Sequence, residues 1–586
     1  MSAQSKQRAD KNSKSDLQLA LKSMKKIFVS LGIYSFFLNI LMLVAPFYML
    51  VVYDVVMPAK NLNTLYLVTV ITLVFFVGMW ILDYVRSKLM IYTSNKLDAL
   101  LNQRLFESTF ELAAKYPSRA NTQPIRDFSN IKTFLGGQAV FAFFDFPWFP
   151  IYIGIMFAFD TVYGLYGLAA TALLVFITWI NEKKTKEGLE ASNAEYRQAI
   201  NFFDNNLRNV DVVKAMGMKK NLHRIWMERY NKYLITHTEA SSTASFYSNA
   251  SKSFRMMASS MTYGVGAILA IIGSISPGMI IAGSVLLGRA LQPITQMIGT
   301  WKSFTNARIS YQKLNELLLE FPQEQEKLTL PDPEGVIRFE QMVVTPPLGE
   351  KPVLLGIELQ IEAGSVVGVI GPSAAGKSSL AKTIVGIWPP VSGHVRIDGA
   401  DVHQYNTDEL GKHIGYLPQD IELFEGTIAD NISRFGENVE DESIIEAAKL
   451  SGTHELILNL PHGYETKVGP GGVSLSGGQK QRIGLARALF GNPKIVILDE
   501  PNSNLDDAGE YALMMAIRTL KEKGSTVVFI THKKNILSLS DKLIVMEAGK
   551  VKLYDDTETV IKALSQAQVK KVENKEEKRD NDESGQ

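Results

Sequence analysis

Long apolar stretches alternate with charged stretches over the first half of the chain, whereas the second half has short apolar runs in a polar background. Six of the long stretches hold about 20 residues each, enough for an α-helix to cross the hydrocarbon core of a bilayer. They cover residues 27–52, 62–82, 140–159, 163–180, 257–275 and 278–298. The pattern predicts an all-α membrane domain of six spans at residues 21–320, followed by a soluble domain.

Two of these stretches have another interpretation. The first, 27–52, lies near the N-terminus, but it is too long for a removable signal peptide and lacks a small-residue cleavage site. We therefore expect it to remain as a spanning helix. The third, 140–159, carries Asp145, Pro147 and Pro150, so a buried helix of a soluble domain is the alternative there.

Positive charge predicts the orientation of the spans, because Lys and Arg collect on the cytoplasmic side. The cations flanking that side are Lys22, Lys25, Lys26, Arg86, Lys88, Lys96, Arg104, Lys115, Arg119, Lys183, Lys184, Lys186, Lys302 and Arg308. The connections on the opposite side are 57–63, 160–163 and 274–277, and their only cation is Lys60. The N-terminus and the soluble domain are therefore predicted to be cytoplasmic.

The polar parts of the chain complete the domain plan. Charged segments at 97–116 and 191–233 have helical periodicity and are predicted to extend from the membrane, with coupling turns near 122–132 and 202–217 that touch a nucleotide domain. Simple solvated helices are the alternative. The remaining divisions are a disordered segment 1–20, a linker 321–335, a soluble domain 336–565 and a disordered charged tail 566–586.

A phosphate-binding pattern opens the soluble domain's most informative stretch. Residues 371–378 fit G-x-x-x-x-G-K-[ST], preceded by an apolar β-branched run and followed by a helix-like run. A chance match in a Gly-rich turn is the alternative, but strand and helix both flank the loop. The predicted nucleotide-binding residues here are Gly371, Pro372, Ser373, Ala374, Ala375, Gly376, Lys377, Ser378 and Ser379. Lys377 would reach the β- and γ-phosphates of ATP, and Ser378 would bind Mg²⁺.

Two further patterns add hydrolysis chemistry to an α/β phosphate-loop domain. The apolar run 495–498 ends in Asp499 and Glu500, which we assign to Mg²⁺ and to the base that activates water, respectively. A small-residue turn before the helix-like run 480–489 forms a second anion-binding helix N-terminus. Its residues are Ser476, Gly477, Gly478 and Gln479.

With Leu475, this turn resembles the signature of ATP-binding cassette (ABC) proteins, in which it contacts the γ-phosphate held by the partner's loop. The resemblance implies that Gln419 senses Mg²⁺ and the attacking water, that Asp506 is the aspartate of the D-loop, and that His532 is the switch histidine. A structural histidine is the alternative for His532. The family's adenine-stacking aromatic has no counterpart, because the matching region 342–347 reads Met-Val-Val-Thr-Pro-Pro.

Composition excludes several other classes. The formal net charge of +1 gives no field that would favour nucleic acid, and the absence of Cys excludes disulfides and thiolate sites. Residues 46–58, and residues 288–294 with Trp301, are similar to ABC transporters of bacterial type I secretion, in the branch that exports proteases and related proteins. From the short segment before residue 27, we expect no N-terminal peptidase or peptidase-like domain of the kind that some relatives carry.

This resemblance implies a homodimer in the bacterial inner membrane that hydrolyses ATP, with Mg²⁺, to export a polypeptide. It would work with a periplasmic adaptor (membrane fusion) protein and an outer-membrane channel. A lipid or drug exporter on the same scaffold is one alternative. An ATP-gated regulatory membrane protein is another alternative. It would not need the base Glu500, which this chain has.

Three ions fall in or near the apolar stretches, where charges are costly unless they are paired or face water. They are Asp54, Asp145 and Arg289. We expect them to line a translocation path or to pair across it. The alternative, snorkelling at helix ends, is strongest for Asp54.

Overall fold

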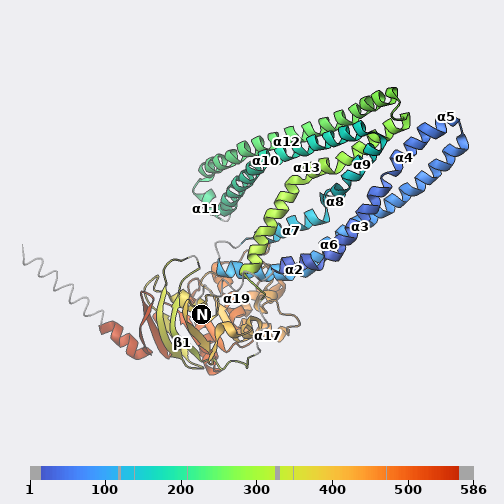
Figure 1. Ribbon diagram of the computed structural model, residues 1–586. Helices are drawn as coiled ribbons and strands as arrows, with labels where there is room; N and C mark the ends of the chain where they lie inside the picture. The colour runs from blue at the N-terminus through green and yellow to red at the C-terminus, as the bar shows by residue number, and fades with distance from the viewer. Residues whose placement is uncertain are drawn as a thin grey trace, which may run out of the picture. The chain divides into compact units, whose positions relative to one another are not determined.

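The computed structural model describes residues 15–116, 121–137, 139–207, 209–323, 330–347, 349–469 and 471–566. The chain divides into two compact units, which we describe separately (Figure 1). The helical unit ends at Pro322, and the unit that contains the strands begins at Gln323 and includes the end of one long helix from Leu112 onward.

The helical unit is built from long helices and short connecting ones. In chain order they are α2 (Asp16–Ser23), α3 (Lys25–Leu41), α4 (Val44–Val51), the π-helical turn η2 (Val52–Val56), α5 (Met57–Ala59), α6 (Leu62–Lys115), α7 (Gln123–Gly136), α8 (Ala139–Asp145), the 3₁₀ turn η4 (Phe146–Trp148), α9 (Phe149–Phe159), α10 (Thr161–Leu207), α11 (Val210–Ala215), α12 (Lys219–Ile272) and α13 (Pro277–Glu320). Among the described residues, six helical segments are long and apolar enough to cross a membrane, which confirms the six predicted spans.

Two spans are interrupted, and a third, α13, is continuous although it contains a proline. Pro147 and Pro150 lack the N–H that would continue a helix, and the chain passes there from α8 through η4 into α9. Pro293 lies inside α13. The first span changes from α3 to α4 at Met42 and Leu43 and then takes a π-helical turn. The apolar pattern predicted the spans but not these breaks.

The prediction that residues 1–20 are disordered is wrong for residues 16–20, because the helix α2 begins at Asp16. Ser15 caps this helix by accepting a hydrogen bond from the Gln18 N–H, at 3.3 Å. Asp16 forms an ion pair with Arg104 of α6, at 2.8 Å, and Leu17 is fully buried. Residues 1–14 lie outside the described residues, as do Arg119 and the tail from residue 567.

The predicted helical extensions of 97–116 and 191–233 are continuous with the spans in α6, α10 and α12. The region near 122–132, predicted as a turn, is instead the helix α7. Its Asp127 is buried and accepts a hydrogen bond from the Ser310 hydroxyl of α13, at 2.8 Å. The region near 202–217 contains α11, where Val210 and Val212 are exposed. Contact of either region with a nucleotide domain stays a prediction.

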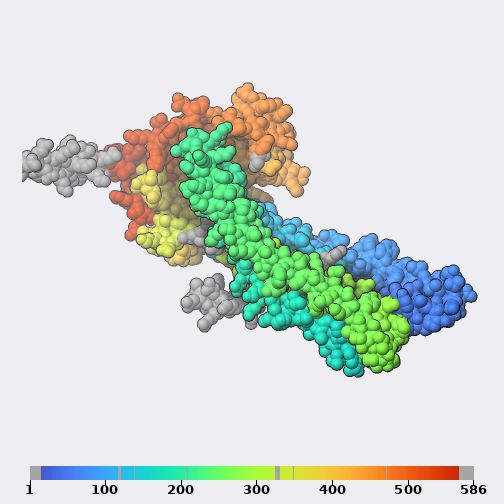
Figure 2. Space-filling model, turned by 90° about the horizontal axis from the view of Figure 1, so that it is seen from above, coloured from blue at the N-terminus to red at the C-terminus, as the bar shows by residue number. Residues whose placement is uncertain are grey.

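Packing in the helical unit centres on α13, which contacts α4, α7, α8, α9 and α12. Helices α10 and α12 lie side by side, and α12 forms a green ridge along this unit in Figure 2. The core of α9, α10, α12 and α13 includes Tyr152, Met156, Tyr163, Leu287 and Leu291, all buried. Large apolar side chains elsewhere on α6 and α12 are exposed, as expected of helices that face lipid.

Asp54 has a structural role at the start of α13. Its carboxylate accepts a hydrogen bond from the Gly278 N–H, at 2.8 Å, and another from the Ser276 hydroxyl. A Cβ at Gly278 would lie 2.6 Å from this carboxylate, so the two segments are in close contact. Asp54 therefore caps a helix N-terminus, where negative charge is stabilised, rather than forming an ion pair across a path.

The described residues of the second unit form three sheets. A four-stranded sheet has the order β2-β1-β4-β5, a six-stranded sheet the order β12-β11-β3-β10-β9-β6, and β7 pairs with β8. The strands are β1 (Ile337–Val344), β2 (Leu354–Ile361), β3 (Val366–Ile370), β4 (Ser392–Ile397), β5 (Ala400–Asp401), β6 (Ile414–Leu417), β7 (Gly426–Thr427), β8 (Lys467–Val468), β9 (Ile495–Asp499), β10 (Thr526–Ile530), β11 (Lys542–Glu547) and β12 (Lys550–Asp556).

The helices of this unit cover the sheets. They are α14 (Lys377–Ile384), η5 (Val402–Gln404), α15 (Thr407–His413), α16 (Ile428–Ile432), α17 (Asp441–Leu450), α18 (His454–Leu458), η6 (Gly463–Glu465), α19 (Gly477–Leu489), α20 (Asp507–Glu522), α21 (Lys534–Leu537) and a last helix at 557–566. One core joins the four-stranded sheet to α14 and one face of the six-stranded sheet, and a second core packs α19 and α20 on the other face.

Candidate functional site

Four segments that the sequence singled out meet at one edge of the six-stranded sheet. Strands β3, β10, β9 and β6 are neighbours and run parallel, so their carboxyl ends lie together. All positions of β9 and β10 are buried, as in a sheet covered on both faces. The edge where parallel strands end is the usual ligand site of such sheets. The phosphate loop, Glu500, His532 and Gln419 follow these strands at that edge.

The loop after β3 has the backbone of a phosphate cradle. Gly371, Ala374 and Gly376 have φ angles of 156°, 63° and 98°. A Cβ at Gly371 would lie 2.3 Å from the Met546 carbonyl oxygen, so only glycine fits there. Lys377 Nζ donates to the carbonyl oxygens of Gly371, at 2.8 Å, and Pro372, at 3.0 Å. The lysine thus lies across the loop, above the N-terminus of α14, where an anion is favoured.

Asp499, at the end of β9, has the environment of a metal ligand. Its side chain lies close to the hydroxyl of Ser378, the residue predicted to share the metal. Burial raises the pKa of the Asp499 carboxyl, and the nearby Glu500 carboxylate adds to this effect. Its Oδ1 atom is buried and has no hydrogen-bond partner within the described parts of the chain. A buried carboxylate oxygen without a donor, next to a hydroxyl, fits the oxygen ligands of Mg²⁺.

Glu500 is held in a strained backbone position directly after Asp499. Its φ angle of 50° lies in the left-handed region, which is uncommon for a residue with a side chain. The Glu500 N–H donates to the Ile530 carbonyl oxygen, at 3.0 Å, and the carboxylate accepts from Gln419 Nε2, at 3.1 Å. Strain of this kind collects at functional sites. The structure therefore brings together Glu500 and Gln419, which are 81 positions apart in the chain.

Gln481 positions this region, and the sequence analysis did not identify it. The side chain is buried in α19, and its Nε2 donates to the Glu500 carbonyl oxygen, at 3.2 Å, and to Ser503 Oγ, at 3.3 Å. Its Oε1 accepts from the Asn504 N–H, at 2.9 Å. A polar residue on the apolar face of an amphipathic helix was the only signal, and that signal does not reveal its partners.

The two remaining predicted residues flank the edge. His532 lies just beyond β10 and is exposed. Asp506 caps α20 by accepting from the Gly509 N–H, at 2.9 Å, and forms an ion pair with Arg482. The Gly509 hydrogen bond and Arg482 hold the pKa of the Asp506 carboxyl below its usual range. Asp506 therefore has a structural role within the chain, whatever it contacts in an assembly.

The signature turn forms the N-terminus of α19. Ser476 Oγ accepts from the Gln479 N–H, at 3.2 Å, and Gln479 Oε1 accepts from the Ser476 N–H, at 2.8 Å. These reciprocal bonds form a capping box. Gly478 packs against Asn504, since a Cβ there would lie 2.7 Å from the Asn504 carbonyl oxygen. Within the described residues, the side-chain bonds of Ser476 and Gln479 are to each other and not to the phosphate loop.

Replacing Lys377 with Ala should weaken ATP binding by roughly 10- to 100-fold, because it removes a charge-assisted contact to phosphate. Equilibrium binding of a fluorescent ATP analogue to the purified chain measures this. The exposed Lys412, on α15, provides the matched control, and Lys412→Ala should bind as tightly as the unsubstituted chain. Unchanged affinity in Lys377→Ala would contradict the assignment of the loop.

Comparisons with known proteins agree with this geometry. A family model described as ABC transporter matches residues 354–503, and one described as ABC transporter transmembrane region matches residues 28–294. The chain is 39% identical over 553 residues to the type I secretion system ATP-binding protein PrsD of Rhizobium meliloti (strain 1021), covering 94% of this chain and 95% of that protein.

Two other matches add to these. The chain is 31% identical over 542 residues to the alpha-hemolysin translocation ATP-binding protein HlyB of Escherichia coli, covering 91% of this chain and 76% of that protein. Its fold is similar to that of a solved bacterial Atm1-family ABC exporter with ATP bound. The TM-score is 0.77 at 21% identity, over 92% of this chain and 96% of that one.

Proposed function

Because this chain belongs to the ABC transporters, in the branch of the type I secretion system ATP-binding proteins, we propose that it acts as a pair of identical copies in a bacterial inner membrane. It is an ATP-hydrolysing, multi-pass membrane protein that exports a polypeptide. The observation that carries this function is the meeting of Lys377, Asp499, Glu500 and Gln419 at one sheet edge, in a chain whose described part also has six membrane-length helices.

ATP would bind with its phosphates in the cradle of residues 371–379. The backbone N–H groups at the start of α14 and the Lys377 ammonium would hold the β- and γ-phosphates. Mg²⁺, bound by Ser378, Gln419 and Asp499, would neutralise charge on these phosphates. The Thr345, Pro346 and Pro347 segment after β1 offers no aromatic ring for the base, so we expect weak discrimination among nucleoside triphosphates.

Hydrolysis would begin at Glu500. Its carboxylate would accept a proton from the attacking water, and Gln419, which already bonds this carboxylate at 3.1 Å, would orient the water. His532, just past the end of β10, would contact the γ-phosphate. The bond from Gln481 to the Glu500 carbonyl oxygen would hold the base in place.

A second copy is needed because each chain has one phosphate loop and one signature turn. The signature turn of one copy would complete the phosphate site of the other, and Asp506 would lie near the interface of the two copies. The turn is formed by Ser476, Gly477, Gly478 and Gln479. The N-terminus and the ATPase unit would be cytoplasmic, on the side where Lys and Arg collect. A periplasmic adaptor protein and an outer-membrane channel would continue the export path.

Reconstitution in lipid vesicles tests this function. Secreted polypeptides encoded beside an adaptor gene should change ATP turnover by the purified chain, and a labelled one should cross the vesicle membrane only with ATP. Vesicles with Glu500→Gln serve as the control. If small hydrophobic compounds stimulate turnover and no polypeptide does, the chain is a lipid or drug exporter instead.

A further inference from the structure

A cavity of about 410 Å³ lies among α3, α6, α8 and α13 of the helical unit. One wall carries Asn39, Asp83, Arg86 and Asp145, and α13 contributes Arg289, Gln292 and Gln296. We call this space the polar cavity. Polar groups at membrane depth are retained where they meet each other, water or a ligand. The two walls differ in whether their charged side chains form ion pairs with one another.

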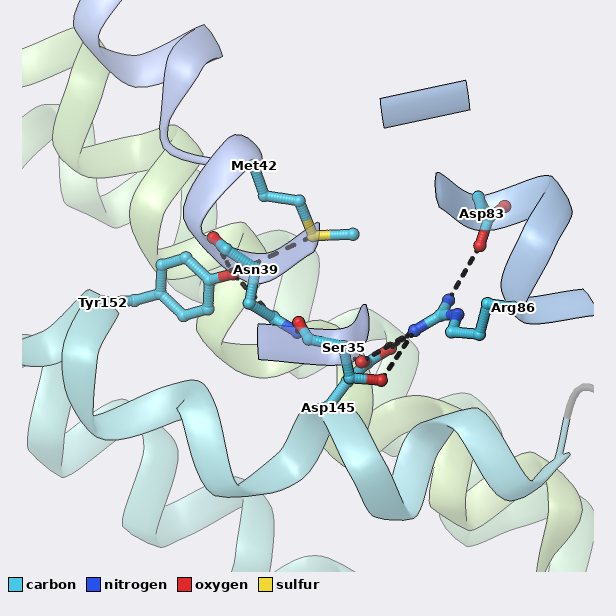
Figure 3. Close-up of polar contacts among 7 residues, drawn as sticks. All are labelled: Ser35, Asn39, Met42, Asp83, Arg86, Asp145 and Tyr152. Atoms are coloured by element: carbon cyan, nitrogen blue, oxygen red, sulfur yellow. Dashed lines mark hydrogen bonds and ion pairs between the residues drawn. The ribbon is translucent and has the colours of Figure 1, made fainter. Parts of the chain in front are cut away.

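The wall opposite α13 carries a network of hydrogen bonds and ion pairs centred on Arg86 (Figure 3). Arg86 Nη1 bonds both carboxylate oxygens of Asp145, at 2.9 and 3.1 Å, and Nη2 bonds Asp83, at 2.9 Å. Asn39 Nδ2 donates to Asp145, at 3.1 Å, and Tyr152 donates to Asn39 Oδ1, at 2.8 Å. Arg86 is thus paired with both Asp83 and Asp145, and this wall keeps one net negative charge.

Arg289 forms no direct ion pair of this kind, and its charge is met only across the cavity by the excess negative charge of the opposite wall. Its one side-chain hydrogen bond is to the neutral Gln292 Oε1, at 3.3 Å, and no carboxylate of the described residues lies within ion-pair distance of its guanidinium. A cation away from bulk water is costly without a counter-charge. A guanidinium is also the group best suited to bind a carboxylate with two parallel hydrogen bonds.

The rest of the α13 face supplies groups that match a peptide. Residues 289, 292 and 296 follow the spacing of one helix face, so both glutamine amides lie on the side of Arg289. Pro293 has no N–H, so the Arg289 carbonyl lacks the usual helix donor four residues on. Amide donors and acceptors beside a guanidinium suit an extended segment with an acidic side chain or a terminal carboxylate.

We propose that the polar cavity binds the exported polypeptide through a carboxylate on Arg289, with Gln292 and Gln296 bonding its backbone. The proposal rests on the export function above. The Arg86 network holds α3, α6 and α8 as a wall of the cavity, and the bonds of Arg86 to Asp83 and Asp145 reduce the repulsion of the acidic group by these carboxylates. The cavity thus selects acidic segments over neutral ones of the same shape.

The test uses the full chain in lipid nanodiscs and two short dye-labelled peptides that differ only in one central residue, Glu or Gln. Fluorescence anisotropy should show the acidic peptide binding about 10- to 100-fold more tightly. Arg289→Gln should abolish this preference, and Arg289→Lys should keep part of it. Arg308→Gln, at an exposed position of the same helix, is the matched control and should change nothing.

Several outcomes would overturn the proposal. They are equal binding of the two peptides by the unsubstituted chain, a preference that survives Arg289→Gln, and a preference that anionic lipid in the nanodisc removes, which would assign the cavity to a headgroup. Basal ATP turnover is measured on every variant. If the unsubstituted chain does not hydrolyse ATP, the proposed function is refuted. If it hydrolyses ATP normally but shows no preference between the peptides, only the proposal that the polar cavity binds an acidic segment is refuted.

Discussion

Replacing Glu500 with Gln should lower ATP turnover by about 10²- to 10⁴-fold, the usual contribution of a general base. The amide cannot accept the proton of the attacking water, but it preserves the size of the side chain and leaves the phosphate loop intact. ATP should therefore still bind. Phosphate release and equilibrium nucleotide binding, measured on the same preparation, separate the two effects.

The matched control for this prediction is Glu522→Gln, at an exposed position near the end of α20. It removes the same charge from the same unit and should leave turnover unchanged. Unchanged turnover in Glu500→Gln would refute the base assignment. A parallel loss of binding would instead show that the substitution disturbs the strained turn at Glu500, whose φ angle is 50°.

Replacing Arg86 with Leu should destabilise the helical unit by about 3–5 kcal/mol, because Asp145 would be left buried without its counter-charge. Arg86 and Asp145 are nearly enclosed, with side-chain exposures of 7% and 11%. Thermal unfolding in detergent measures the effect. The neighbouring Lys88 is exposed, so Lys88→Leu controls for loss of a cation from α6 and should be close to neutral.

A double-mutant cycle separates the ion pair from simple packing. Arg86→Leu with Asp145→Leu removes both charges, and this variant should be more stable than the sum of the single losses implies. Additive losses would mean that the two side chains do not interact. The expected coupling follows from their two hydrogen bonds, at 2.9 and 3.1 Å.

The spans and the ATPase unit were predictable because each depends on local pattern. A window of about 20 apolar residues indicates a membrane helix whatever it packs against. An apolar run that ends in Asp499 and Glu500 likewise indicates a strand with carboxylates at its end. Because parallel strands end at a shared edge, the meeting of Gln419 and Glu500 follows once the strand order is known.

Contacts between distant segments were not predictable in this way. Arg86 was interpreted only as a cation that orients the second span, yet it lies buried on Asp145, 59 positions away. Asp54 was expected to line a path, but it caps α13, which is more than 200 positions distant. The sequence places Gln481 in a helix but does not reveal its partners. Its hydrogen bond to the Glu500 carbonyl oxygen depends on the packing of α19 against the Glu500 turn.

The central claim is that two identical copies share ATP between the phosphate loop of one and the signature turn of the other. The chain contains no cysteine, so Ser373→Cys with Gly477→Cys introduces the only thiols. Both positions are exposed, and a Cβ at Gly477 has room, with its nearest neighbour at 3.6 Å. Under mild oxidation, ATP should produce a covalent dimer that neither single variant forms. A chain that never cross-links with ATP, and hydrolyses it at full rate as a monomer, would contradict the account.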